Sequence, residues 1–168
     1  AASLAAGDVD DDGKPELLLA KKGFARAFRV APAGTLEVVD QFNARDPGAE
    51  IAGVACADLA GDGRPEVVLL DRARARLWVL GRKEKEPYQV LREIRLPAIR
   101  PRGLASADLN GDGRPDLLVS AEDRFGILYA GGTDFRLALA AQYETELKDV
   151  RLDMIRRGDL DGDGKPAL

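Results

Sequence analysis

The sequence of 168 residues contains no histidine and only one cysteine, Cys56. Without histidine, the common zinc sites and histidine-based general base catalysis are excluded. A single cysteine cannot form an intrachain disulfide, and its small apolar neighbours predict a core residue rather than a reactive thiol. No apolar run approaches the roughly eighteen residues of a membrane-spanning helix, so we expect no membrane insertion.

What the sequence does contain is one acidic stretch in four copies. The copies are D-V-D-D-D-G-K-P-E from Asp8, D-L-A-G-D-G-R-P-E from Asp58, D-L-N-G-D-G-R-P-D from Asp108 and D-L-D-G-D-G-K-P-A from Asp159. Their first residues lie 50, 50 and 51 positions apart, which indicates an internal repeat. The repeats span approximately residues 1–50, 51–100, 101–150 and 151–168. Because the last one is truncated, we expect the chain to be part of a longer array.

Oxygen-bearing side chains recur at the first, third, fifth and ninth positions of this stretch, with glycine at the sixth. Calcium prefers about six to eight oxygen ligands, and glycine permits the positive φ that a tightly turning loop needs. The seventh residue is basic in every copy and can contribute only its backbone carbonyl. The pattern therefore predicts structural Ca²⁺ at up to four loops. The candidate ligands are Asp8, Asp10, Asp12, Lys14 and Glu16 in the first loop, Asp58, Asp62, Arg64 and Glu66 in the second, Asp108, Asn110, Asp112, Arg114 and Asp116 in the third, and Asp159, Asp161, Asp163 and Lys165 in the fourth.

The residues around each loop distinguish it from a calcium loop that lies between helices. Such a loop carries a glutamate at its twelfth position, whereas Leu19, Leu69 and Val119 occupy that position here. Proline at the eighth position blocks continuation into a helix, and the apolar runs that follow have the length and composition of buried strands. A strand–loop–strand arrangement is therefore the better interpretation.

The four loops are not equivalent. The second has Ala60 at the third position and the fourth has Ala167 at the ninth, so each lacks one side-chain oxygen. We therefore expect the first and third loops to be the stronger calcium sites. The alternative is that Asp-Gly turns merely connect strands, because both residues favour turns. Against it, three or four acids directed at one point would repel one another without a cation.

Two further strands are expected after each loop and its apolar run. Phe28, Trp78 and Leu128 each lie twenty positions after the first aspartate of their loop, which indicates a repeated third strand, and a fourth apolar segment follows. Four strands in about fifty residues are typical of a propeller blade. Small residues immediately before the loops, such as Gly7 and Ala57, predict innermost strands that their neighbours approach closely.

The pattern D-x-[D/N]-x-D-G-x-x-[D/E] between two strands, recurring about every fifty residues, resembles the FG-GAP or VCBS-type repeat of integrin-α-like β-propellers. The resemblance covers the whole chain as a periodicity and the loops specifically. It implies an all-β fold, a β-propeller segment of four-stranded antiparallel blades with three blades and the start of a fourth. It also implies that calcium is structural and stiffens the loop between the first two strands of a blade. Protein or glycan ligands would then use the loops of the opposite face.

We therefore predict a calcium-stabilised repeat module for binding, adhesion or scaffolding in a secreted or cell-surface protein, and not an enzyme. The alternative is a propeller domain of an extracellular enzyme that degrades polysaccharides or other polymers. Nearly all paired carboxylates of the sequence belong to the four loops, which leaves little material for a catalytic pair.

Basic residues gather in the segments expected on the ligand-binding face of the first two blades. They are Lys21, Lys22, Arg45, Arg72, Arg74, Arg100 and Arg102. One hypothesis is that they contact an acidic partner, such as an anionic polysaccharide or an acidic protein loop; the alternative is that they are solvated loop residues. Arg72, Arg74 and Arg76 alternate in sequence, which would place them on one solvated face of a strand. No aromatic residues interleave with them, so we expect no nucleic-acid binding.

Overall fold

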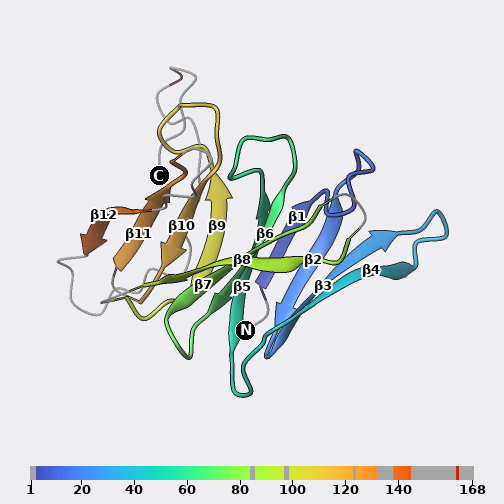
Figure 1. The fold of residues 1–168 in the computed structure, drawn as a ribbon, viewed down its shortest axis with the longest axis horizontal. Helices are drawn as coiled ribbons and strands as arrows, with labels where there is room; N and C mark the ends of the chain where they lie inside the picture. The colour runs from blue at the N-terminus through green and yellow to red at the C-terminus, as the bar shows by residue number, and fades with distance from the viewer. Residues whose placement is uncertain are drawn as a thin grey trace.

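The computed structural model describes residues 3–83, 86–96, 99–122, 124–131, 138–144 and 162. These residues form twelve β-strands (Figure 1). They contain no helix of the length and hydrophobicity needed to cross a bilayer. The strands are β1 (Ser3–Gly7), β2 (Glu16–Lys21), β3 (Phe24–Val30), β4 (Leu36–Asn43), β5 (Ile51–Ala57), β6 (Glu66–Asp71), β7 (Arg76–Gly81), β8 (Gln89–Arg95), β9 (Gly103–Ala107), β10 (Asp116–Ser120), β11 (Arg124–Tyr129) and β12 (Ala138–Glu144).

The strands form three antiparallel four-stranded sheets in sequence order, β1 to β4, β5 to β8 and β9 to β12. We call them blades 1, 2 and 3. They lie side by side with blade 2 in the middle, and among the described residues they do not close into a ring (Figure 1). The predicted all-β class and four-stranded blades are confirmed. Apart from Gly162, the predicted fourth repeat lies outside the described residues.

The burial of the strands follows from the position of each blade. In β2 of blade 1, Glu16, Leu18 and Ala20 are buried, and the residues between them are half-buried. In the middle blade, every residue of β6 and β7 is buried. A strand is buried along its whole length when both faces of its sheet are covered, and at alternate residues when one face is covered. The burial of β6 and β7 therefore marks blade 2 as packed on both sides, although the run E-L-L-L-A of β2 is just as continuous in sequence.

Two apolar cores fill the spaces between the blades. The first joins residues of blade 1, such as Leu18 and Ala27, to Val54 and Trp78 of blade 2. The second joins Val68 and other residues of blade 2 to residues of blade 3. Neighbouring blades thus pack face to face, as the blades of a propeller do.

The innermost strands β1, β5 and β9 approach one another closely. A Cβ atom on Gly7 of β1 would lie 2.4 Å from the Cβ of Cys56 in β5. A Cβ on Gly53 of β5 would lie 2.6 Å from the Cβ of Leu104 in β9. Both distances are shorter than real side chains tolerate, so glycine is required at these two contacts. The prediction of crowded innermost strands is confirmed.

The third strand of blade 2 has a different register from the expected one. Phe28 pairs with Leu17 and Leu128 pairs with Leu117, but the residue in this place in blade 2 is Leu80, which pairs with Val67. A β-bulge directly precedes Phe28, Leu80 and Leu128 in the pairing with the fourth strand, which confirms that these three are equivalent. The equivalence of Trp78 with Phe28 was therefore wrong.

The cause of this shift is the turn between the second and third strands. In blade 2 the turn holds residues 72–75, between the paired Asp71 and Arg76, whereas in blade 1 it holds only residues 22–23. Arg72 and Arg74 consequently lie in a turn, and β7 begins only at Arg76. The expected strand face of three alternating arginines does not exist.

Candidate metal sites

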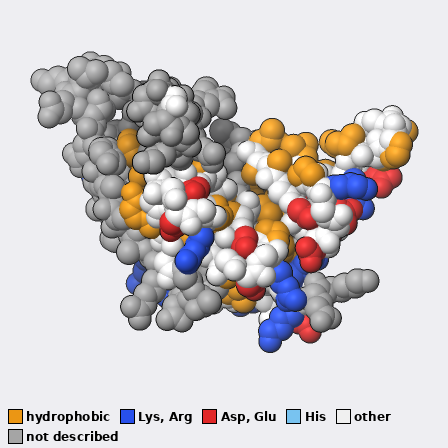
Figure 2. All heavy atoms as spheres, turned by 90° about the horizontal axis from the view of Figure 1, so that it is seen from above, with side chains coloured by type: hydrophobic (Ala, Val, Ile, Leu, Met, Phe, Trp, Pro, Cys, Tyr) orange, Lys and Arg blue, Asp and Glu red, His pale blue; other side chains and the backbone are white. Residues whose placement is uncertain are grey.

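The three described acidic loops lie at the same end of the blades, above the sheets in the view of Figure 1. Each connects the first and second strands of its blade, as the sequence predicted. Seen from that side, Asp and Glu side chains gather over the loops, with a few Lys and Arg side chains between them (Figure 2). The sixth-position glycines Gly13, Gly63 and Gly113 have φ of 81°, 85° and 84°. The fourth position also has a positive φ in each loop, including at the non-glycine Asp11 with 63°.

The first aspartate of each loop holds the backbone of its own loop. Asp8 accepts hydrogen bonds from the N–H groups of Asp11 and Gly13, both at 2.7 Å. Asp58 and Asp108 do the same with the fourth- and sixth-position N–H groups of their loops, at 2.7–2.9 Å. Burial acts to raise the pKa of Asp108, but the N–H groups of Gly113 and Gly111 outweigh it and hold the pKa below its usual value. The Asp108 carboxylate is therefore ionised at neutral pH.

The ninth-position acid closes each loop from below. Glu16, Glu66 and Asp116 are buried, with exposed fractions of 1%, 5% and 0%. Each accepts the backbone N–H of the second loop residue, at 3.0, 2.9 and 2.9 Å. The second residues Val9 and Leu59 are buried in the cores, so the backbone there points its N–H at the acid. The ninth-position carboxylates are thus built into the structure.

In the first loop, ligand oxygens of Asp8, Asp10 and Glu16 lie within 4.8 Å of one another. Asp10 Oδ1 is buried and has no hydrogen-bond partner among the described residues. A carboxylate oxygen buried in this way is costly unless something satisfies it. Each carboxylate offers about four lone-pair positions, so the hydrogen bonds already made leave room for a cation. The donor set, all oxygen and mostly anionic, fits Ca²⁺.

Arg29 adds a cation to the first loop that sequence reasoning missed. Its guanidinium, from the end of β3, forms a hydrogen-bonded ion pair with Asp10 and lies 3.2 Å from Asp12 and 3.3 Å from Glu16. The only signal in the sequence is that Arg29 directly follows Phe28, a residue of the predicted third strand. Spacing alone does not give the strand register that brings this residue to the loop.

The second loop has Ala60 in place of the third-position acid, and among the described residues its acids form no ion pair like that of Arg29. Ala60 instead donates its backbone N–H to Glu66 at 3.3 Å. Burial, together with the neighbouring charges of Asp62 and Asp58, raises the pKa of Glu66.

In the third loop, the described geometry brings the predicted residues to one turn. Asn110 donates to Asp112 at 3.1 Å and accepts the N–H of Asp112 at 2.9 Å. Asp112 also accepts the N–H of Arg114 at 2.8 Å, as the fifth-position acids do in the other two loops. The remaining predicted ligands, Asp159, Asp161, Asp163 and Lys165, lie outside the described residues.

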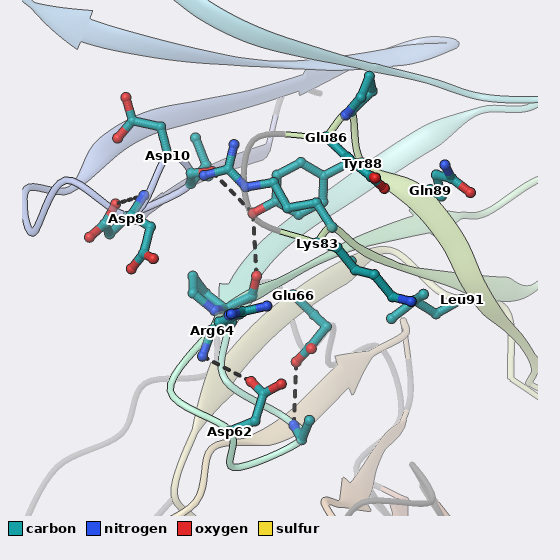
Figure 3. A pocket seen from close by; sticks show the side chains of 17 residues that line it. Asp8, Asp10, Asp62, Arg64, Glu66, Lys83, Glu86, Tyr88, Gln89 and Leu91 are labelled. Carbon is teal, nitrogen blue, oxygen red and sulfur yellow. Dashed lines mark hydrogen bonds between the residues drawn. The ribbon is translucent and has the colours of Figure 1, made fainter.

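A groove of about 890 Å³ separates the first and second loops (Figure 3). Asp8 and Asp10 line one side of it, Asp62 and Glu66 the other, and Tyr88 lies between them. The Tyr88 hydroxyl lies 3.1 Å from the carbonyl oxygen of Val9 and 3.3 Å from that of Pro65, so its one proton is shared between two loops. Burial raises the pKa of Tyr88, which keeps this donor protonated.

The opposite end of the blades holds a buried charge cluster around Arg76. Its guanidinium lies 3.2 Å from Asp71 and 3.1 Å from Glu93, and it also hydrogen-bonds Asp46. It stacks 4.4 Å from the ring centroid of Trp78. Asp71 is 0% exposed and Arg76 only 8%. The interpretation of Arg76 as part of a solvated face was therefore wrong.

Other basic residues at this end are paired at the surface. Arg72 lies 2.7 Å from Glu50, with about half of each side chain exposed, and Arg102 lies 2.8 Å from Glu122. Arg74 lies 3.8 Å from Asp46. The hydrogen bond from Arg76 holds the pKa of Asp46 below its usual value. Much of the positive charge predicted for an acidic partner is thus already neutralised within the chain.

Cys56 faces the innermost strand of blade 1. Burial, with smaller contributions from Asp8, Glu16 and Glu66, raises the pKa of its thiol to about 12. A thiol with such a pKa is almost never deprotonated at neutral pH. Its place against Gly7 and its pKa agree with the predicted structural role.

Comparison with known proteins gives one family match. The sequence model of the FG-GAP-like repeat matches twice, at residues 8–69 and 58–119. The two matches together span more than half of the chain. Each match begins at one acidic loop and ends in the strand that follows the next acidic loop. A comparison with curated proteins finds no match.

Solved structures provide likenesses at low sequence identity. A protein from Lactobacillus plantarum superposes with a TM-score of 0.60 at 13% identity, over 93% of this chain and 57% of that one. A chain of a humanized mutant of the Chaetomium thermophilum Polycomb Repressive Complex 2, bound to an inhibitor, superposes with a TM-score of 0.59 at 12% identity, over 77% of this chain and 28% of that one. The present chain thus spans little more than half of the first relative. At these identities the likeness concerns the fold alone.

Proposed function

Because this chain belongs to the FG-GAP-like repeat family, we propose that it is a calcium-stabilised β-propeller repeat module of a secreted or cell-surface protein. Its role is binding, adhesion or scaffolding, not catalysis. The observation that supports calcium most directly is the third loop, which has an oxygen at every predicted side-chain ligand position and brings Asn110 and Asp112 together at one turn. The first loop supports the same chemistry, because three carboxylates converge there and Asp10 Oδ1 is buried without a hydrogen-bond partner among the described residues.

The residues that would hold calcium are those that close each loop. The first-position aspartate and the ninth-position acid already accept hydrogen bonds from backbone N–H groups. Their positions are therefore fixed, and they need little reorganisation to bind an ion. When bound, calcium supplies the positive charge that converging carboxylates lack. The chain's own contribution is to hold these acids close together, at the cost of mutual repulsion.

Thermal unfolding in calcium and in chelator tests this proposal. If a site binds with a Kd of ~10⁻⁴ M, as weak extracellular modules do, calcium at about 1 mM adds ~1.4 kcal/mol per occupied site. The melting temperature should therefore rise in calcium and return to its starting value after chelation. Magnesium at the same concentration is the control for ionic strength. Superimposable curves in calcium and chelator would remove calcium from the proposal.

For the partner, we propose a protein or glycan on the face opposite the loops. A second hollow of about 450 Å³ lies there between blades 1 and 2, lined by Lys21, Lys22, Glu50 and Arg72 among others. Both lysines are exposed. Since Arg72 is paired with Glu50, the lysines carry the charge that an acidic partner would meet.

Binding to a panel of acidic glycans, with calcium held constant, tests the partner proposal. Electrostatic contact predicts affinity that falls with salt, since the Debye length shrinks from ~10 Å at 0.1 M to ~3 Å at 1 M. Replacing Lys21 and Lys22 by serine should weaken binding, whereas replacing Lys14, on the loop face, should not. Equal binding by both variants would place the partner elsewhere.

A further inference from the structure

We propose that Arg29 is a built-in counter-ion of the first loop, so that this loop holds its carboxylates together with a guanidinium and takes up calcium only when Arg29 is displaced. The inference deepens the proposed function and rests on it. It starts from the contacts of one side chain: Arg29 pairs with Asp10 and lies 3.2 Å from Asp12 and 3.3 Å from Glu16. These are three of the four acids that the loop offers as ligands.

The position of Arg29 belongs to the architecture of the blade. It directly follows Phe28, the residue that pairs with Leu17, and so stands level with Glu16. The residues after the equivalent Leu80 and Leu128 are Gly81 and Tyr129. Gly81 stands in the same place, because a Cβ on it would lie 3.8 Å from Cγ of Glu66. Every blade thus brings the end of its third strand to the ninth-position acid, but among the described blades only blade 1 places a cation there.

In blades 2 and 3, different donors satisfy the buried ninth-position acid. Glu66 is served by two backbone N–H groups, and Asp116 accepts the N–H of Ala130, which follows Tyr129, at 2.9 Å. Neither arrangement adds a positive charge. Glu16 receives one backbone N–H, from Val9, together with the guanidinium. The arginine therefore takes up acceptor positions that in the other blades stay with neutral donors.

A guanidinium and a divalent ion compete for the same oxygens. The affinity of oxygen-ligand calcium sites depends on the net charge of the ligands and on their rigidity. A fixed positive charge within about 3–4 Å of the carboxylates reduces the net negative charge of the ligands and also repels the ion directly. The first loop has the most acids of the four, but it should bind calcium more weakly than its acid count indicates. The third loop, with no such arginine in the described structure, should be the stronger site.

The experiment replaces Arg29 and counts calcium ions by isothermal titration of the whole chain. Arg29→Gln removes the charge and keeps a polar side chain of similar reach. We expect it to bind one more calcium ion per chain than the parent protein, or to raise the affinity of one site at least tenfold. Adding Asp10→Asn to Arg29→Gln should abolish this gain, which assigns it to the first loop. The matched control is Arg26→Gln, on the same strand but bonded to Gln41, which should leave the titration unchanged.

A second readout does not depend on calcium. In chelator, Arg29→Gln should melt below the parent protein, because the acids of the first loop then repel one another without a counter-ion. Arg29→Lys, which keeps a positive charge, should recover part of the lost melting temperature and bind calcium like the parent.

The outcomes separate this inference from the proposed function. An unchanged titration in Arg29→Gln overturns the inference, and so does a loss of one ion from the parent protein on Asp10→Asn alone. Asp112→Ala in the third loop judges calcium binding itself: if it changes nothing and the parent binds no calcium, the proposed function fails. A gain of one ion in Arg29→Gln would support the counter-ion role even then.

Discussion

The two ends of the blades treat their carboxylates in opposite ways. At the loop end, Asp8, Asp58 and Asp108 are held by backbone N–H groups of their own loops. At the other end, Asp46, Asp71, Glu50 and Glu93 are held by arginines. Backbone donors fix the position of an acid and leave its charge in place, whereas an arginine fixes it and neutralises it.

This difference supports the proposal that the loop end, and not the opposite end, binds a cation. An end whose ion pairs are complete gains little from an added ion. An end whose acids are ordered but uncompensated gains much, because the repulsion among fixed charges is relieved. Arg29 is the exception at the loop end, and for that reason it is the most informative single residue there.

The largest effect that would test this comparison comes from Arg76→Met. Removing the guanidinium leaves Asp71, which is 0% exposed, with two backbone N–H donors and only the more distant Arg74, 4.0 Å away, as a cation. The loss of a close partner from a buried carboxylate costs on the order of 3 kcal/mol. We expect a clear fall in the denaturant midpoint at neutral pH. The matched control is Arg72→Met, four residues earlier and half-exposed, which should cost ~1 kcal/mol or less. Similar losses for the two arginines would show that the cluster is not a closed network.

The loop end should respond next, and unequally. Asp112→Ala in the third loop should remove most of the ~1.4 kcal/mol that about 1 mM calcium adds at a site with a Kd of ~10⁻⁴ M. Asp62→Ala in the second loop should remove less of the stabilisation by calcium, because that site already lacks one side-chain oxygen at Ala60. Calcium titrations of both variants, each against its own chelated melt, measure the difference. A greater loss from Asp62→Ala would mean that counting ligands does not rank these loops.

A smaller effect concerns Glu66, whose pKa is raised in the folded protein. A raised folded pKa means that the native state holds the proton more tightly than the unfolded chain, so stability falls as pH rises through this range. In calcium-free buffer, Glu66→Gln should therefore be more stable than the parent at pH 7. The advantage should shrink as the pH falls below the ordinary glutamate pKa of about 4.3, where the carboxyl becomes protonated in both states. Denaturation at a series of pH values checks this, and a parent more stable than the variant at pH 7 would contradict it.

The smallest effect should follow from breaking a surface pair at the neutralised end. Arg102 and Glu122 lie 2.8 Å apart, with about half of each side chain exposed. Arg102→Gln should cost ~1 kcal/mol or less, and the cost should vanish in 1 M salt, where the Debye length is ~3 Å. A loss of stability that persists in 1 M salt would show that Arg102 contributes more than a screened surface ion pair.

The repeat spacing and the punctuation by Gly and Pro predicted the architecture well. Acidic loops fifty residues apart, each followed by an apolar run, gave the first two strands of every blade and the position of the loops between them. They succeeded because those features are local: a turn, a proline and a short apolar run each constrain the chain within a few residues. The crowded innermost strands were also predictable, since Gly7 and Ala57 recur at the same place.

The partners of single charged residues were not predictable in the same way. Arg29 meets Asp10 across 19 positions, and Arg76 meets Asp46 across 30. Both contacts depend on register and on turn length, and the turn of residues 72–75 is longer than its counterpart in blade 1. Because of the two extra residues in this turn, Arg76 lies in a closed charge cluster and not on the solvated strand face that the sequence predicted. A charge pattern alone contains no information about such a shift.

Tyr88 has a consequence for how the first two loops behave toward ligands. Its one proton is shared between carbonyls of both loops, and its ring packs edge-on against Phe42 at 5.1 Å. A ligand that moves one loop must therefore change the hydrogen bond that the phenol offers to the other. By thermodynamic reciprocity, whatever factor this adds to binding at the first loop is added equally at the second. The tyrosine thus connects the backbones of two neighbouring loops through a single hydroxyl group.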